Sequence, residues 1–207
     1  MGKKISIIGS GFSSLASACY LAKNGYEVTV YEKNSSLGGR ARQFSKKGFT
    51  FDMGPSWYWM PDVFDKFFND FGKETKDFYK LKKLNPAYKV YFGENDSISI
   101  EDSLEKIKKV FESEEKGSAK KLEEFISNAK ENYAIAVTDL LYKMPGLSPL
   151  ELITKKTVLK AGSFLSNIRK EVRKRFKNKK LRSILEFPVL FLGAKASNTP
   201  AFYNFMN

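Results

Sequence analysis

The sequence contains no histidine, and this absence excludes several kinds of active site. Ser-His-Asp and Cys-His catalysis, histidine general bases and histidine metal ligands are all removed. Cys19 is the only cysteine, so a disulfide framework is excluded, and its place on the apolar face of a predicted helix indicates a small core residue. The sequence thus identifies no metal site and no catalytic acid or base.

Long hydrophobic runs are also missing. The longest candidates, such as residues 188–192, fall far short of the roughly 18 apolar residues needed to cross a bilayer. A predicted strand occupies the N-terminal stretch where a signal peptide would lie. We therefore expect a cytoplasmic protein that is either soluble or attached to a membrane at its surface.

Hydrophobic content and positive charge are both present. Hydrophobic residues make up 42% of the 207 residues, enough to fill a core, and the formal net charge is +13. Residues 151–182 contain twelve lysines and arginines against two glutamates, so this basic block carries +10 of the net charge. Such a block can bind nucleic acid, bind an anionic membrane face or form an ordinary solvated helix surface.

The N-terminal stretch has the order of elements that is typical of a dinucleotide-binding unit. A strand over residues 5–8 leads into a turn that contains Gly9 and Gly11, and a helix follows. A second strand over residues 27–31 then ends at Glu32. This order predicts an α/β fold with a Rossmann-like βαβ unit.

The residue types in this unit fit the chemistry of a dinucleotide. Gly9 permits the tight turn, and Gly11 lets the backbone approach a pyrophosphate, which the helix N-terminus attracts. Glu32 can accept hydrogen bonds from a ribose diol and disfavours the 2′-phosphate of NADP. Ser14 stands where the pattern has its third glycine, and serine is small enough to keep the helix close to the strand.

Two further glycine segments follow, and the first of them favours FAD over NAD. Gly38 and Gly39 would let a second backbone segment approach the same pyrophosphate, and Arg40 can pair with phosphate oxygens. Gly54 and Pro55 follow a strand and precede an aromatic cluster, as expected where backbone passes a flat ring system. The alternatives are a simple surface turn for the first segment and an ordinary strand end for the second.

A second structural unit is predicted from about residue 80. Residues 87–100 have the pattern of a β-hairpin, and several amphipathic helices follow, with a loop at 144–149. We therefore divide the chain into residues 1–80, the Rossmann-like part, and residues 81–207, an α+β substrate or lid part.

The motifs together resemble a known family. In sequence order they are Gly9-x-Gly11, Glu32, Gly38-Gly39-Arg40 and Phe51-Asp52-Met53-Gly54-Pro55. With these motifs the chain resembles the bacterial phytoene desaturase family of flavoprotein oxidoreductases, most closely the carotenoid desaturases of flavobacterial type. The similarity continues through residues 84–88 and 186–194, and so covers essentially the whole chain.

The resemblance implies a cofactor, a reaction and a location. FAD would lie along the βαβ unit, held by Gly9, Gly11, Ser14, Glu32, Gly38, Gly39 and Arg40, with Gly54 and Pro55 near the flavin ring. Hydride would pass to the flavin from an allylic C–C bond of a phytoene-like isoprenoid. Because that substrate dissolves in membranes, the basic block would attach the chain peripherally to one. Carotenoid isomerases and ketolases share these motifs.

Members of the resembled family are roughly twice as long and return to the FAD site near their C-termini. The sequence therefore corresponds to an N-terminal portion, and the fold is incomplete relative to the family. The alternative hypotheses are an inactive truncated fragment and a module whose basic surface binds a membrane or, nonspecifically, nucleic acid. No specific nucleic-acid motif is present.

Overall fold

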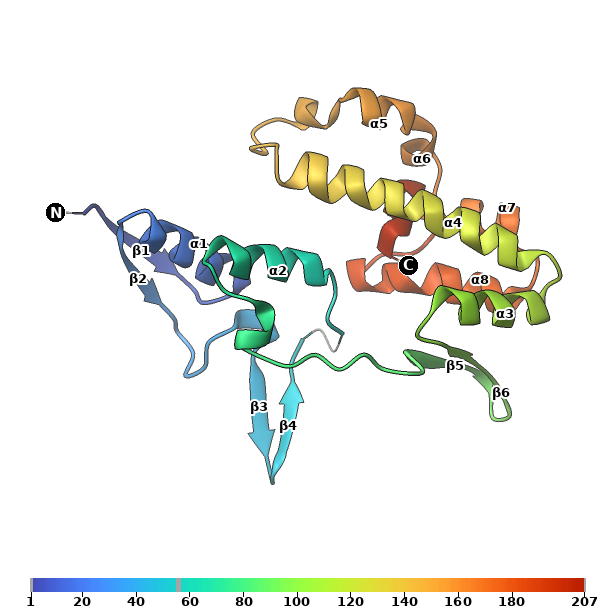
Figure 1. Ribbon diagram of the computed structural model, residues 1–207, viewed down its shortest axis with the longest axis horizontal. Helices are drawn as coiled ribbons and strands as arrows, with labels where there is room; N and C mark the ends of the chain where they lie inside the picture. Colours follow the sequence, from blue (N-terminus) through green and yellow to red (C-terminus); the bar gives the residue numbers. More distant parts are fainter. Residues whose placement is uncertain (1, 55–56, 207) are drawn as a thin grey trace. The chain divides into compact units, whose positions relative to one another are not determined.

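The computed structural model describes residues 2–54 and 57–206, and the chain divides into two compact units, Met1–Leu81 and Lys82–Asn207 (Figure 1). Among the described residues, no helix has both the length and the apolar content needed to span a membrane.

The first unit begins with the predicted βαβ arrangement. Strand β1 (Lys4–Ile8) pairs in parallel with β2 (Glu27–Tyr31), with Ile5 opposite Val28 and Ile7 opposite Val30. Helix α1 (Phe12–Lys23) connects them, and Gly25, with φ of +84°, follows its end. The predicted α/β arrangement is therefore confirmed.

The interpretation of Cys19 as a core residue is wrong, because its side chain is exposed. In the part of the chain that the structure describes, the sheet beside α1 has two strands, β1 and β2, so it covers a narrow part of the helix surface. Ser10 is the only residue of this unit that is buried among those the structure describes.

The rest of the first unit is a hairpin followed by aromatic packing. A short 3-10 turn, η1 (Gly39–Ala41), leads into antiparallel strands β3 (Gln43–Lys46) and β4 (Phe49–Asp52). Helix α2 (Pro61–Asp70) and the 3-10 turn η2 (Thr75–Asp77) follow. Rings of the α2 segment meet α1, since Phe64 lies 6.0 Å from Phe12 and Phe71 lies 5.1 Å from Tyr20 between ring centroids.

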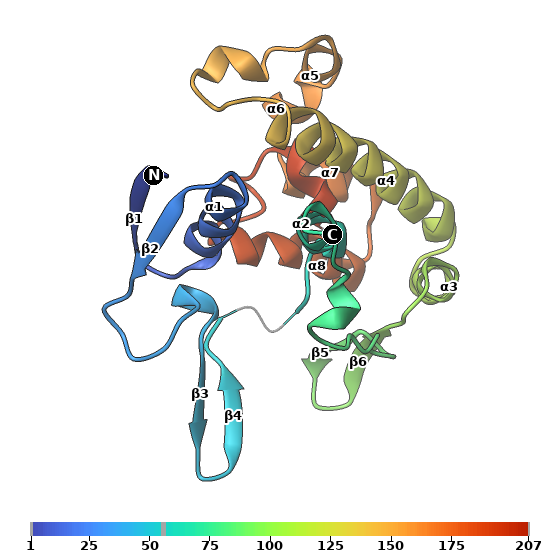
Figure 2. The ribbon, with the colours of Figure 1, turned by 60° about the vertical axis from the view of Figure 1, so that its left-hand side comes forward.

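The second unit is a hairpin followed by helices (Figures 1 and 2). Strands β5 (Tyr88–Gly93) and β6 (Asp96–Ile100) are antiparallel. The helical segments are α3 (Leu104–Glu114), α4 (Ser118–Tyr133) with its π-helical continuation η3 (Ala134–Leu141), η4 (Pro149–Leu152), α5 (Lys155–Leu159), α6 (Ala161–Leu165), α7 (Ile168–Arg175), α8 (Lys179–Glu186), η5 (Phe187–Leu192) and η6 (Ala201–Met206). The hairpin and helices predicted for this part are therefore present.

The hydrophobic core of the second unit includes apolar residues of the basic block. Ile168, Val172, Phe176 and Leu181 are fully buried and pack with Phe111 and Phe125 of the preceding helices. The rings of Phe111 and Phe176 meet edge to face at 6.0 Å. The basic block is thus an amphipathic part of a folded domain, with its apolar side in the core.

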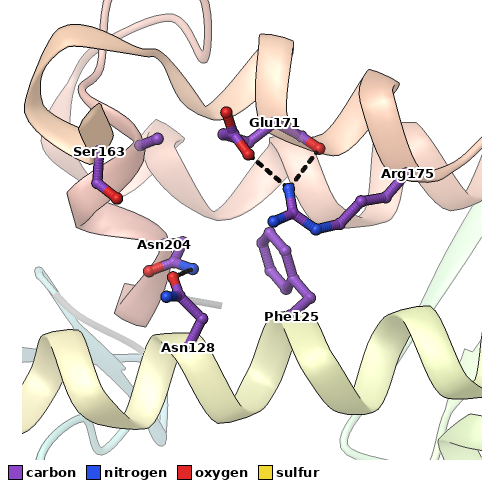
Figure 3. A pocket seen from close by; sticks show the side chains of 7 residues that line it. Phe125, Asn128, Ser163, Glu171, Arg175 and Asn204 are labelled. Atoms are coloured by element: carbon purple, nitrogen blue, oxygen red, sulfur yellow. Dashed lines mark hydrogen bonds and ion pairs between the residues drawn. The ribbon is translucent and has the colours of Figure 1, made fainter. Parts of the chain in front are cut away.

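A buried amide network joins α4 to the C-terminal turn η6. Asn132 is fully buried, and its Nδ2 donates to the Asn204 Oδ1 (2.8 Å) and to the Phe202 carbonyl (3.2 Å). Beside this network is a cavity of about 70 Å³, where Arg175 donates to the Glu171 carboxylate (2.6 Å) (Figure 3). Because the amide nitrogens of Asn132 and Asn204 donate to oxygens within this network, we assign the network to the packing of α4.

We predict that replacing Asn132 by alanine destabilises the second unit by about 1–3 kcal/mol, because the substitution removes the amide that donates to Phe202 and Asn204. Urea unfolding followed by circular dichroism measures the change. Glu124→Ala, at an exposed position of the same helix, is the control and stays within about 0.5 kcal/mol of wild type. Equal unfolding curves for the two variants would contradict the prediction.

Candidate cofactor-binding site

The predicted glycine turn lies between β1 and α1. Gly9 has φ of +93°, a left-handed conformation that favours glycine, and its N–H donates to the carbonyl of Tyr31 at the end of β2 (2.7 Å). Gly11 is the residue before α1, and the helix has neither a side-chain cap nor an acidic residue in its first turn. Ser14 lies in that turn and is half-buried. The helix N-terminus can therefore attract an anion.

Glu32 bonds back to this turn. Its Oε2 accepts hydrogen bonds from the Ser10 N–H (2.9 Å) and the Ser10 hydroxyl (2.6 Å). Its Oε1 accepts from the backbone N–H (2.9 Å) and the side-chain amide (2.7 Å) of Asn34. These bonds, with the Ser10 hydroxyl the largest cause, lower the pKa of Glu32 to about 2. The carboxylate is therefore ionised throughout the physiological range.

The bonds to Glu32 also set a condition on ligand binding. A carboxylate offers about four acceptor positions, and the four donors from Ser10 and Asn34 match that number. A ribose hydroxyl that binds Glu32 must therefore replace one of the side-chain donors. The Ser10 hydroxyl can rotate away, since a hydroxyl turns about a single bond.

The second glycine pair lies against the first. The Gly38 N–H donates to the Ser10 carbonyl (3.0 Å), and Gly38 and Gly39 have φ of +103° and +60°. A Cβ added to Gly39 would lie 3.1 Å from the Gly11 Cα, which is closer than ordinary packing allows. The structure therefore brings Gly9, Gly11, Glu32, Gly38 and Gly39 together around Ser10.

The third glycine segment meets the turn that follows Gly39. A Cβ on Gly54 would clash with the carbonyl oxygen of Arg40, so this close approach requires glycine. The Arg40 side chain is exposed and has no hydrogen bond within residues 2–54 and 57–206. It is therefore available to a phosphate. Pro55 lies outside the described residues.

The apolar residues beside the glycine turn are open. Ile8, at the carboxyl end of β1, is 90% exposed, and Tyr31, at the same end of β2, is 58% exposed. Phe12, the first residue of α1, is 59% exposed. In parallel α/β sheets, ligands bind outside the carboxyl ends of the strands, which is where these side chains lie.

Sequence reasoning did not identify Ser10 or Asn34 as partners of Glu32. The motif specifies glycines and an acid, and it leaves the residue between the glycines open. The position of Asn34, two residues beyond the acid, is one from which a short amide can bond locally, so this contact had a weak sequence signal.

Comparison with known proteins identifies relatives of the chain. Residues 7–72 match the family model described as an NAD(P)-binding Rossmann-like domain. The whole chain is 36% identical over 210 residues to carotenoid 3,4-desaturase of Haloarcula japonica, spanning 42% of that protein. It is 34% identical over 209 residues to 4,4′-diapophytoene desaturase (4,4′-diaponeurosporene-forming) of Staphylococcus aureus strain Newman, where 97% of the chain covers 40% of the relative. Along its whole length the chain is similar to carotenoid desaturases.

The resemblance inferred from the motifs is therefore confirmed. The chain spans about 40% of the length of these curated relatives. A triple mutant of putrescine oxidase, from a cofactor-binding redesign, has the same fold, with a TM-score of 0.57 and 16% identity over 99% of the chain and 41% of that structure.

We predict that Ser10→Ala raises the pKa of Glu32 from about 2 toward its ordinary value of 4.5. Because the bonds form with the ionised carboxylate, they stabilise the folded state. This contribution to the free energy of unfolding is complete above the ordinary pKa of 4.5 and is lost as the pH falls through about 2. A ¹³C NMR titration of the Glu32 carboxyl measures the shift, with Ser13→Ala, on an exposed position of α1, as the control. An unchanged Glu32 pKa in Ser10→Ala would contradict the assignment.

Proposed function

We propose that this chain holds FAD and forms the cofactor-binding part of an oxidoreductase that desaturates an acyclic carotenoid precursor. The observation that carries the proposal is the meeting of two glycine segments and an ionised Glu32 at one turn. The relatives support the reaction, since their names describe desaturation of carotenoids and of diapophytoene. Those names favour desaturation over the isomerase and ketolase alternatives.

The residues present fit a dinucleotide. The N-terminus of α1 favours negative charge, and a Cβ at Gly39 would crowd the Gly11 backbone where a pyrophosphate would pass. Glu32 is ionised and can accept hydrogen bonds from a ribose once the Ser10 hydroxyl rotates. Arg40 offers a cation to the phosphates. Gly54 and Pro55 belong to the segment that we place near the flavin.

The work of this chain in the reaction would be binding and orientation. A bound flavin would supply the oxidant, taking up hydride from one carbon of the substrate bond while a proton leaves the neighbouring carbon. The chain contains no histidine, and we assign no residue to that proton. Its side chains would fix the cofactor, and the exposed apolar residues Ile8 and Tyr31 would line the site.

We also propose that residues 151–182 attach the chain to an anionic membrane surface. An acyclic carotenoid precursor is too apolar to diffuse through water, so its enzyme gains from contact with the membrane that holds it. Lysines near an anionic surface contribute about 1 kcal/mol each, and the block is rich in them.

We predict that the purified chain binds added FAD and that Glu32→Gln lowers the affinity about tenfold, because a neutral amide accepts hydrogen bonds from ribose less well. Quenching of flavin fluorescence measures the affinity. Glu27→Gln is the matched control, since it removes the same charge at the other end of β2. Failure of the wild-type chain to bind FAD, or equal affinities for both variants, would overturn the assignment.

A further inference from the structure

The basic block has fewer free charges than its sequence indicates. Six of its twelve cations form ion pairs within the second unit: Lys156, Lys160, Arg169, Arg173, Arg175 and Lys180. Their acidic partners cancel much of the local field. A surface that attaches to a membrane therefore needs a contribution besides charge.

Such a contribution lies in residues 141–165, which we call the apolar arm. In both ribbon views this segment runs along the side of α4 away from α3 and α8 (Figures 1 and 2). Its most exposed apolar side chains are Leu147 (85%), Leu150 (72%), Ile153 (65%), Leu159 (85%) and Leu165 (91%). Leu141, Leu152 and Val158 are more than half exposed as well. So many open aliphatic side chains in one short segment indicate a binding surface.

Several backbone groups of the arm are hydrogen-bonded to side chains of the arm itself, as a loop that enters a membrane requires. The Glu151 carboxylate accepts hydrogen bonds from the N–H groups of Gly146 (2.8 Å), Leu147 (3.0 Å) and Ser148 (3.1 Å). Thr157 is buried, and its hydroxyl donates to the Leu152 carbonyl (2.5 Å). Because these polar groups are paired inside the arm, the leucines can leave water without carrying unpaired N–H groups with them.

The charges on the arm fit an anionic lipid surface. The arm contains four lysines, Lys143, Lys155, Lys156 and Lys160, and one acid, Glu151. Lys160 pairs with Glu131, which lies outside the arm. Lys143 and Lys156 are each 62% exposed, and they share one partner, Asp139. Short amphipathic helices with aliphatic side chains and lysines lie in the interface plane of bilayers.

We propose that the apolar arm inserts its leucines into the headgroup region of an anionic bilayer. This inference rests on the proposed membrane attachment and names the residues that make it. The inserted side chains are Leu147, Leu159 and Leu165, with Lys155, which forms no ion pair among the described residues, at the level of the lipid phosphates. The paired cations of α7 and α8 then serve the fold of the second unit rather than the lipid.

Vesicle flotation of the 207-residue chain tests the proposal. We expect binding to phosphatidylcholine vesicles that contain phosphatidylglycerol, and a loss of at least about tenfold in Leu147→Ser/Leu159→Ser/Leu165→Ser. The matched control is Leu84→Ser/Tyr91→Ser/Leu190→Ser, which removes exposed apolar groups of the same unit outside the arm and retains binding. Circular dichroism of each variant checks that the fold is retained.

A depth measurement separates insertion from surface charge. We expect a fluorophore attached to the introduced thiol of the Cys19→Ser/Leu159→Cys variant to be quenched by lipids brominated on their acyl chains. The same fluorophore on the introduced thiol of the Cys19→Ser/Tyr91→Cys variant is not quenched. Flotation that is unchanged by the arm substitutions would overturn the inference and leave the electrostatic attachment standing. If the wild-type chain does not float with vesicles of any composition, both the insertion of the arm and the electrostatic attachment are overturned. Dimers that the arm substitutions convert to monomers, without flotation, would assign the arm to a second copy of the chain instead.

Discussion

The contact between Ser10 and Glu32 is the interaction on which the first unit depends. It joins the turn after β1 to the end of β2, and the Gly38 N–H bonds to the carbonyl of the same serine. Ser10 is the only buried residue among those described in this unit, which therefore has little apolar core of its own. Hydrogen bonds and close backbone approach, rather than burial, fix the geometry of the candidate site.

The second unit is stabilised in a different way. Its fully buried side chains come from α3, α4, α7, α8 and Phe176, which follows α7. Acids around this core pair with cations of the basic block. Glu186, for example, accepts from both Arg169 (3.2 Å) and Arg173 (3.0 Å). A run of positive charge in a sequence is therefore a weak guide to partners until the acids that fold against it are known.

The sequence predicted what local patterns encode. Strand alternation, helical spacing and glycine turns located the βαβ unit, the hairpin at 87–100 and the amphipathic helices, because each depends on neighbouring residues. It could not predict the exposure of Cys19, which depends on how many strands cover α1, or the amide pair of Asn132 and Asn204, which are distant in sequence. The close approach of Gly54 to Arg40 could not be predicted either, because a tertiary contact produces no periodic pattern in the sequence.

The small core of the first unit links its stability to its proposed ligand. Ile8, Phe12 and Tyr31 are more than half exposed at the carboxyl ends of the strands, where a dinucleotide would lie. A ligand that binds only the folded form stabilises it in proportion to the logarithm of the ligand concentration over Kd. Because FAD would cover apolar groups that this unit leaves open, cofactor binding and the folding of the first unit would be strongly coupled, whereas the second unit has a core that does not depend on the ligand.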